Sequence, residues 1–224
     1  RNLTDSPGVH DRDPAWSPDG KRIAWFSDRD GEYRLFVRDA VGREEARSWD
    51  LGNGGFYHQP QWSPDGKHVL FFDKTNRIAY VTLETGKVTE VFRNRGSLGL
   101  AWASPTWHPS SKWIAFTSRH PDTAYDRLCL YDVEKAGVTS VTDDFGSADG
   151  PVFSHDGKYL FFTASVETGP QRFGLDMSAS AARSGRNNLY VVVLRKTEKN
   201  PLAPKSDEGV DDAKYKKKKK DGDD

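Results

Sequence analysis

The side chains best suited to catalysis or metal binding in this sequence are six histidines and one cysteine, Cys129. No two histidines stand three or four residues apart on a segment with helical periodicity, so the local spacing of a metal site is absent. Cys129 falls in the middle of an apolar, strand-like segment, where an inert buried thiol is a better interpretation than a nucleophile. A single cysteine also excludes an intrachain disulfide and a cysteine-rich zinc site. We therefore expect neither a metal nor another cofactor.

Catalytic motifs and a strong charge bias are absent as well. The sequence contains no G-x-S-x-G, G-x-x-x-x-G-K-[ST], G-x-G-x-x-G or H-E-x-x-H pattern. Lysine plus arginine and aspartate plus glutamate both number 33, so the net charge is zero and nucleic acid is not an expected partner. No run of about 18 apolar residues is available for a membrane-spanning helix. A free-standing enzyme is therefore the least supported interpretation.

Four tandem repeats organise the chain. The segment Trp16–Lys21, WSPDGK, recurs at intervals of about 45 residues, beginning at Trp62, at Trp107 and, with phenylalanine in place of tryptophan, at Phe153. A proline stands two residues before each of these aromatic residues. Each repeat continues with a Pro-Asp-Gly type of turn, an apolar strand and, after a variable loop, a third strand. A polar fourth strand closes the first three repeats, as expected for a solvent-facing edge.

Residues that recur in every repeat have a structural explanation. The repeated aspartates (Asp19, Asp65 and Asp156) are interpreted as turn residues rather than catalytic carboxylates. The repeated tryptophans (Trp16, Trp62 and Trp107) are interpreted as the core between repeats rather than as ligand-stacking rings. Ser111 stands where the other repeats have glycine, so we expect strain there if this turn position requires a positive φ.

The repeats predict an all-β protein, a β-propeller with four four-stranded blades. The propeller is expected to span residues 1–204, with residues 1–4 as the outer strand of a preceding or closing blade. The lysine- and aspartate-rich residues 205–224 are expected to be a disordered charged linker. The four blades are expected at residues 11–51, 56–93, 103–143 and 147–196.

The blades are expected to form an open arc of a larger propeller. The alternative is a closed four-blade ring, in which Leu3 and Thr4 would pair beside Tyr190 and Val192. Closure at four blades would require packing angles suited to a larger ring to change, and packed cores resist such a change. An arc leaves two apolar blade faces exposed, so we expect self-association. The first residues are not a signal peptide and lack an initiator methionine, so a fragment or a processed product is expected.

Four residues are candidates for substrate contacts at the channel or its rim. His10 and His58 precede the innermost strands of the first two repeats. Arg172 and Phe173 lie in a long loop of the fourth repeat, residues 164–188, and loops of this length are usually functional or disordered. This loop is either a contact surface or channel rim, or else a flexible decoration.

The WSPDG-K-IAF pattern of the repeats resembles the WD40-like propeller repeats of TolB-type and tricorn-type proteins. More specific similarity to tricorn-type proteases lies in Arg1–Val9 with Arg12–Gly20, in Leu160–Ser165 and in Leu189–Leu194. The segment Pro201–Glu208 is similar to the exit linker of that family's second propeller. The resemblance covers about residues 1–208.

This resemblance implies a non-catalytic role within a serine peptidase of the S41 class. Tricorn-type proteases carry a six-bladed and a seven-bladed propeller, followed by two catalytic domains around a PDZ domain. The second propeller is expected to gate or guide peptide substrates and to dock the downstream PDZ and catalytic domains. The family's catalytic serine and histidine have no counterpart in this sequence. A cytoplasmic location is implied, with an extracytoplasmic one as the alternative.

The competing interpretation is a TolB-like propeller that binds protein partners without an attached protease. The residues that follow Asp224 in the full gene would separate the two interpretations. A PDZ domain and a peptidase core would support the first, and a stop codon or a different partner domain would support the second.

Overall fold

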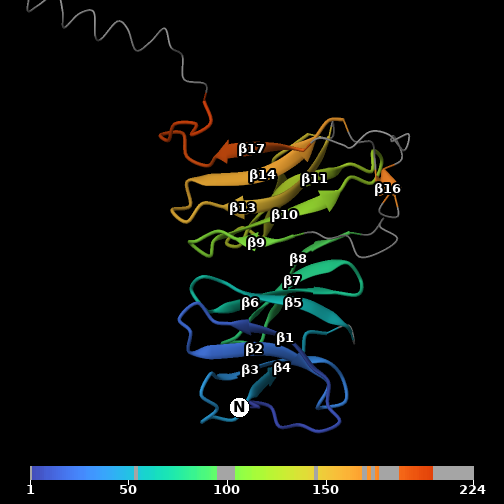
Figure 1. Ribbon diagram of the computed structural model, residues 1–224, viewed down its shortest axis with the longest axis vertical. Helices are drawn as coiled ribbons and strands as arrows, with labels where there is room; N and C mark the ends of the chain where they lie inside the picture. Colours follow the sequence, from blue (N-terminus) through green and yellow to red (C-terminus); the bar gives the residue numbers. More distant parts are fainter. Residues whose placement is uncertain are drawn as a thin grey trace, which may run out of the picture.

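The computed structural model describes residues 2–52, 55–94, 104–143, 146–167, 171–172, 175–176 and 187–203. Antiparallel sheets follow one another in sequence order from one end of the molecule to the other (Figure 1). Each four-stranded sheet is built from consecutive strands, as expected for the blades of a propeller. No helix occurs in the described ranges.

The first three blades are four-stranded and the fourth has three strands among the described residues. Blade one contains β1 (Asp11–Trp16), β2 (Arg22–Ser27), β3 (Arg34–Asp39) and β4 (Arg47–Trp49). Blade two contains β5 (Tyr57–Trp62), β6 (His68–Asp73), β7 (Arg77–Thr82) and β8 (Val88–Arg93). Blade three contains β9 (Thr106–Trp107), β10 (Trp113–Arg119), β11 (Asp126–Asp132) and β12 (Gly137–Ser140). Blade four contains β13 (Ser147–Phe153), β14 (Tyr159–Ser165) and β17 (Asn188–Val193), and a separate ribbon pairs β15 (Gln171–Arg172) with β16 (Leu175–Asp176).

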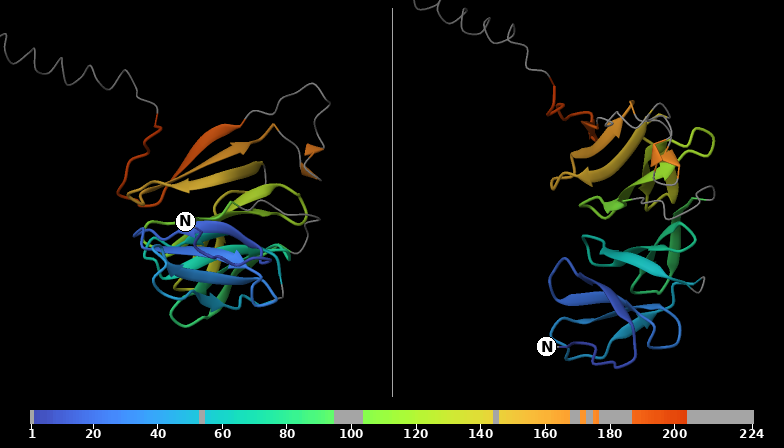
Figure 2. Two further views of the ribbon diagram at one scale, coloured as in Figure 1. Left: turned by 60° about the horizontal axis from the view of Figure 1, so that its bottom comes forward. Right: turned by 45° about the vertical axis from the view of Figure 1, so that its right-hand side comes forward.

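The arrangement is an open arc, as predicted, and not a closed ring. The N-terminus lies at blade one, at one end of the stack, and β17 lies at the other end in Figure 1 and in the right-hand view of Figure 2. Leu3 and Thr4 therefore do not pair beside Tyr190 and Val192. The expected tail, residues 205–224, lies outside the described residues.

Both ends of the arc lack a strand that a complete blade would have. Residues 194–203 contain turns, so blade four has no fourth strand among the described residues. Residues 1–4 were predicted to be the outer strand of a preceding or closing blade. Residue 1 lies outside the described residues, no strand is found at residues 2–4, and Leu3 and Thr4 form bends. At residues 2–4 the physical reason is that a strand requires a neighbouring strand with which to exchange hydrogen bonds, and none lies beside them among the described residues.

The hydrophobic core lies between the blades rather than within them. One cluster joins Phe26 and Leu35 of blade one to Phe71 of blade two, and two further clusters join blade two to three and three to four. Trp62 and Trp107 belong to these interfaces, as predicted, and Trp62 is only 8% exposed. Trp16 occupies the same repeat position but is 62% exposed, because no further blade among the described residues packs on that face of blade one.

The turn after the first strand of each blade is held by its own side chains. Oγ of Ser17 donates to the Asp19 carboxylate at 2.6 Å and accepts the backbone N–H of Arg22 at 2.9 Å. Blades two and four repeat this pattern with their own serine and aspartate. The glycine of this turn has a φ near +68°, and Ser111 takes the same conformation with a φ of 62°. The structure thus confirms that the turn needs a positive φ and explains the recurring aspartates without catalysis.

Candidate functional site

The first strand of each blade lies at one edge of its sheet, and these edge strands gather along one side of the arc. β1 contacts β5, and β9 contacts β13. In propellers the innermost strands surround the central channel. The inner strands are therefore the surface on which a channel-lining site is expected.

A bulge recurs in these inner strands. The pairing register shifts between Arg12 and Ala15 in β1, and the equivalent shifts occur in β5 and β13. The residue before the repeated proline has a positive φ in every blade: Asp13 at 53°, Gln59 at 50°, Ser104 at 32° and Gly150 at 61°. A bulge changes the direction of the side chains beside it. Arg12 and His58 stand directly before this left-handed residue in neighbouring blades.

Arg12 connects the first two blades at this bulge. Its Nη2 donates hydrogen bonds to the carbonyl oxygen of Tyr57 and, at 2.9 Å, to Nδ1 of His58. The same nitrogen lies 3.1 Å from the Asp13 carboxylate. Its guanidinium carbon lies 3.8 Å from the centroid of the Phe56 ring, which is a close cation–π contact. The Arg12 side chain is only 12% exposed, so it is held in place rather than free in solvent.

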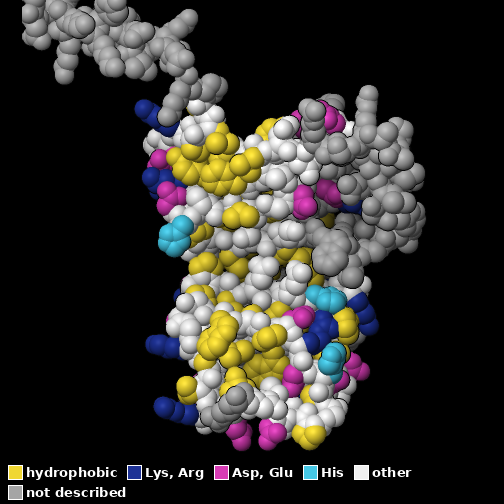
Figure 3. Space-filling view, viewed as in Figure 1, with side chains coloured by type: hydrophobic (Ala, Val, Ile, Leu, Met, Phe, Trp, Pro, Cys, Tyr) yellow, Lys and Arg dark blue, Asp and Glu magenta, His cyan; other side chains and the backbone are white. Residues whose placement is uncertain are grey.

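His10, Arg12, Tyr33, Phe56 and His58 form one connected group, which we call the junction cluster. Nδ1 of His10 hydrogen-bonds the Tyr33 hydroxyl, and the Tyr33 ring meets Phe56 edge-on at 5.5 Å between centroids. Phe56 in turn meets the His58 ring at 4.9 Å. His10 and Phe56 are exposed, so the cluster presents aromatic and imidazole surfaces to solvent. Histidine side chains lie beside basic and acidic ones over the lower two blades in Figure 3.

The contact with Arg12 fixes the protonation of His58. Because a guanidinium can only donate, Nδ1 of His58 must accept, and the ring proton sits on Nε2. Burial lowers the pKa of His58, the neighbouring Arg12 charge lowers that pKa further, and Asp13 opposes the shift. His58 is therefore neutral at pH 7 and offers one N–H donor. The cluster can hold apolar or aromatic groups and donate a hydrogen bond, and it contains no serine, threonine or cysteine nucleophile paired with a base.

The structure brings two of the four predicted contact residues together. His10 and His58 both belong to the junction cluster. Arg172 lies in β15, in the ribbon with β16, and Phe173 lies outside the described residues. Sequence reasoning missed Arg12, Tyr33 and Phe56. A usable signal existed for two of them, because Phe56 and Arg12 occupy the same repeat positions as His10 and His58 in the neighbouring repeat.

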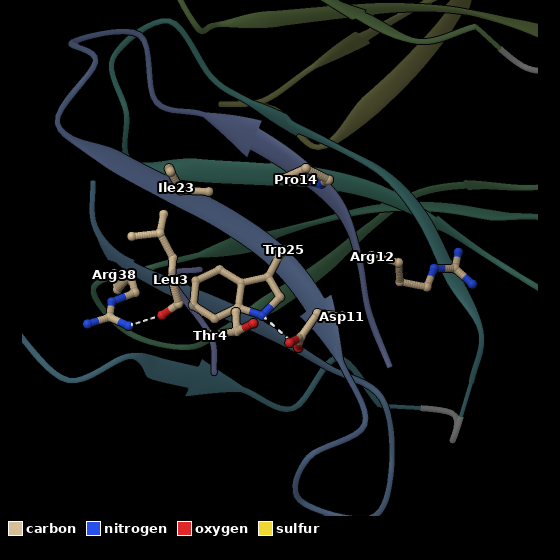
Figure 4. Close-up of a pocket in the computed structure, with 8 residues that line it drawn as sticks. All are labelled: Leu3, Thr4, Asp11, Arg12, Pro14, Ile23, Trp25 and Arg38. Atoms are coloured by element: carbon tan, nitrogen blue, oxygen red, sulfur yellow. Dashed lines mark hydrogen bonds between the residues drawn. The ribbon is translucent and has the colours of Figure 1, made fainter. Parts of the chain in front are cut away.

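A second feature lies on the open face of blade one. A pocket of about 170 Å³ is lined by Leu3, Thr4, Asp11, Arg12, Pro14, Ile23, Trp25 and Arg38 (Figure 4). Trp25 Nε1 donates to the Asp11 carboxylate at 3.1 Å, and Arg38 donates to the carbonyl oxygen of Leu3. This pocket lies on blade one, at the end of the arc, where Leu3 packs against Ile23 and Trp25.

Within the described ranges, no group of three or more His, Cys, Asp or Glu side chains is placed to hold a metal ion. In the same part of the chain no helix has the length and apolar character needed to cross a membrane. The single thiol, Cys129, is buried between blades two and three.

Repeated antiparallel blades, cores between the blades and bulged inner strands define this chain as part of a β-propeller protein. A family model of the tricorn protease second β-propeller domain matches residues 1–224. The chain belongs to this family.

Relatives and solved structures agree with this assignment. Tricorn protease homolog 1 of Streptomyces coelicolor is 26% identical over 211 residues, covering 91% of this chain and 19% of that protein. The crystal structure of the tricorn protease superposes with a TM-score of 0.63 at 21% identity, covering 83% of this chain and 18% of that one. A putative TolB from Agrobacterium tumefaciens superposes with a TM-score of 0.52 at 20% identity, over 81% of this chain and 61% of that one. The chain spans about a fifth of the length of the curated relatives that it matches.

Proposed function

We propose that this chain is a non-catalytic propeller segment of a tricorn-like serine protease, and that it guides or gates peptide substrates along its inner strands. The observation that carries this proposal is the junction cluster, which places aromatic and imidazole surfaces on a rigid wall between two blades. Docking of the downstream PDZ and catalytic domains and a cytoplasmic location are parts of the same proposal.

The chemistry of the cluster suits a passing peptide. Aromatic and imidazole rings stack on apolar and aromatic side chains with little dependence on their identity. The Nε2–H of His58 can donate to a peptide carbonyl, which every residue of a substrate offers. Because Arg12 is already bonded to blade two, the rings are held in position before a peptide arrives, and little conformational entropy is lost on binding. Weak, sequence-tolerant binding is the property that a guiding surface requires.

Binding of a labelled peptide tests this role directly. We expect the chain to bind a fluorescein-labelled peptide of mixed aromatic and aliphatic residues, measured by fluorescence anisotropy. Removing the ring in Phe56→Ala should cost about 0.5–1.5 kcal/mol, roughly a two- to twelvefold weaker affinity. Val138→Ala is the matched control, since Val138 is an exposed apolar residue of the outer strand β12. Equal affinity of Phe56→Ala and the parent chain would overturn the assignment of the cluster.

The TolB-like interpretation, a protein-binding module with no protease, remains the second candidate. The part that superposes on this chain is 61% of the putative TolB but only 18% of the tricorn protease. It would be favoured if the chain bound a folded protein partner but showed no affinity for the labelled peptide.

A further inference from the structure

Asp149 and Gly150 lie at the bulge of β13, the inner strand of blade four (Figure 1). The pairing of β13 with β14 is interrupted between Asp149 and Val152, so Gly150 has no partner residue in the ladder. Its N–H donates instead to Oδ1 of the Asp149 side chain at 2.7 Å. Both residues are exposed to solvent. A backbone nitrogen therefore lies directly against the carboxyl group of the residue that precedes it.

Five aspartate–glycine pairs occur in the described ranges, and the pair at 149 and 150 differs from the other four. In those four the glycine N–H donates to the carbonyl three residues before it, at 2.8–2.9 Å: Gly20, Gly31, Gly66 and Gly157. In three of them a serine hydroxyl at 2.6 Å and a lysine N–H at 3.1 Å also hold the carboxylate: Asp19, Asp65 and Asp156. The Asp149 carboxylate has no other hydrogen bond or ion pair within the described part of the chain.

Thr163 of β14 acts on the same peptide group. Its Oγ1 donates to the main-chain carbonyl oxygen of Asp149 at 3.2 Å. The carbon of that carbonyl is bonded to the Gly150 nitrogen, so the hydrogen bond draws electron density away from this nitrogen and makes its proton easier to remove. The same donor stabilises the negative charge that develops on the oxygen when water attacks the carbonyl carbon.

The pair is accessible because of its place in the blade. Gly150 occupies the position directly before the repeated proline, which Gln59 holds in blade two and Ser104 holds in blade three. Both of these residues are exposed although a further blade packs beside their own. A blade packed beside blade four would therefore leave the position open as well. Glycine also carries no side chain to cover its nitrogen, and nothing lies within 4 Å of its Cβ position.

We propose that Asp149 is a site of spontaneous isomerisation to isoaspartate. The Gly150 nitrogen attacks Cγ of the protonated Asp149 side chain, a bond forms between these two atoms, and the carboxyl hydroxyl leaves with the amide proton as water. The product is a five-membered succinimide ring. Water then adds to the main-chain carbonyl carbon of Asp149 and breaks its bond to the nitrogen, which leaves a free α-carboxylate. One water is released and one is consumed, so neither the mass nor the oxidation state changes.

The structure supplies the proximity that this reaction needs. Reacting groups held in contact react faster than groups that must first find each other. Isomerisation adds one methylene carbon to the main chain between Ala148 and Pro151, both of which are buried, so it alters the packing of the inner wall of blade four. The reaction needs no peptide ligand, and the proposal is independent of the proposed function.

Peptide mapping after incubation of the folded chain at neutral pH tests the proposal. Electron-transfer fragmentation in a mass spectrometer distinguishes isoaspartate from aspartate, and labelling by a protein isoaspartate methyltransferase gives a second readout. We expect isoaspartate to accumulate at Asp149 roughly tenfold faster than at Asp19 or Asp156. All three residues precede glycine, so their rates should converge when the chain is unfolded in urea. Equal rates at the three positions in the folded chain would overturn the proposal.

Three variants separate the chemistry from a general loosening of the fold. Asp149→Glu keeps the charge but would have to close a six-membered ring, so it should abolish the product at this position. Thr163→Val should slow the reaction at Asp149, and Thr163→Ser, which keeps the hydroxyl, should restore it. The rate at Asp19 is the internal control, because loss of the fold would raise it. An unchanged rate at Asp149 in a folded Thr163→Val chain would refute the role of Thr163.

Discussion

Substituting the turn glycines tests how much a contact between two blades contributes to stability. Gly157 has a φ of +67°, and its carbonyl oxygen lies 3.0 Å from Nε2 of His108 in the preceding blade. A Cβ at Gly157 would lie 2.6 Å from that nitrogen, so the His108 ring would have to move. The ring is also packed edge-on against Phe153 and bonded to Ser110. Gly157→Ala therefore combines backbone strain with the loss of a contact between blades.

The two effects can be estimated separately. An alanine in the left-handed region costs about 1–2 kcal/mol. The lost hydrogen bond of His108 costs about 0.5–1.5 kcal/mol. We expect Gly157→Ala to lower the free energy of unfolding by about 1.5–3.5 kcal/mol, the sum of the two effects. Gly20→Ala should cost only the strain of about 1–2 kcal/mol, because nothing lies within 4 Å of its Cβ position.

Urea denaturation followed by tryptophan fluorescence measures these differences. Gly137→Ala is the matched control, since Gly137 lacks a positive φ and its Cβ position is open. Ser111→Gly relieves strain, but it removes the hydroxyl that accepts the N–H of Asp65 at 3.0 Å, so its net effect should stay within about 1 kcal/mol. If Gly157→Ala costs no more than Gly137→Ala, the link between the turn and His108 is refuted.

Two further predictions concern charged groups. Burial lowers the pKa of His58 from its ordinary 6.5, so the unfolded chain binds the proton more readily than the folded one. The free energy of unfolding should therefore fall as the pH drops below about 6.5. His58→Gln should reduce this pH dependence, measured as the difference between the denaturation midpoints at pH 7.5 and 5.5. A dependence unchanged in His58→Gln would assign the effect to other groups such as His68, whose pKa burial also lowers. Asp73→Asn leaves Arg77 without the carboxylate 2.6 Å away in a buried pair, and should cost about 3–5 kcal/mol in the same assay. The exposed pair of Lys112 and Glu134 is its control, and Glu134→Gln should have a much smaller effect; similar losses for both variants would contradict the role of burial.

The blade architecture could be predicted because its signals are local and repeated. The turn at Asp19 needs a side chain that accepts nearby N–H groups and a glycine that follows it, and both stand next to each other in the sequence. The repeated tryptophans were assigned to the core for the same reason. Trp16 shows the limit of this reasoning. Its motif is identical to that of Trp62, yet its burial depends on a neighbouring blade and not on its own sequence.

The candidate site could be predicted only in part, because it forms between blades. His10 and His58 were found from their place before inner strands, but the contact of Arg12 with Phe56 joins two repeats through a bulge. A bulge is set by the conformation of Asp13 before a proline, and the repeat pattern gives no sign of which way the neighbouring side chain will point. The expected outer strand at residues 1–4 depends in a similar way on a partner, because a strand needs a neighbour with which to exchange hydrogen bonds and the local sequence does not supply one.

The positions that vary between repeats are the ones free to take on function. Asp and Gly of the turn recur because each blade needs the same bonds, and Ser110 and Ser111 replace them only where His108 also replaces serine. The residue directly before the left-handed position makes none of these turn hydrogen bonds. Its side chain differs in all four repeats, which have Arg12, His58, Ala103 and Asp149 there. A wall with one position of this kind in each blade can change its charge and polarity along the arc without altering the fold. Selection for what passes along the inner strands would therefore act at this position. At Arg12 a substitution should also cost stability, because its guanidinium group bonds blade one to blade two.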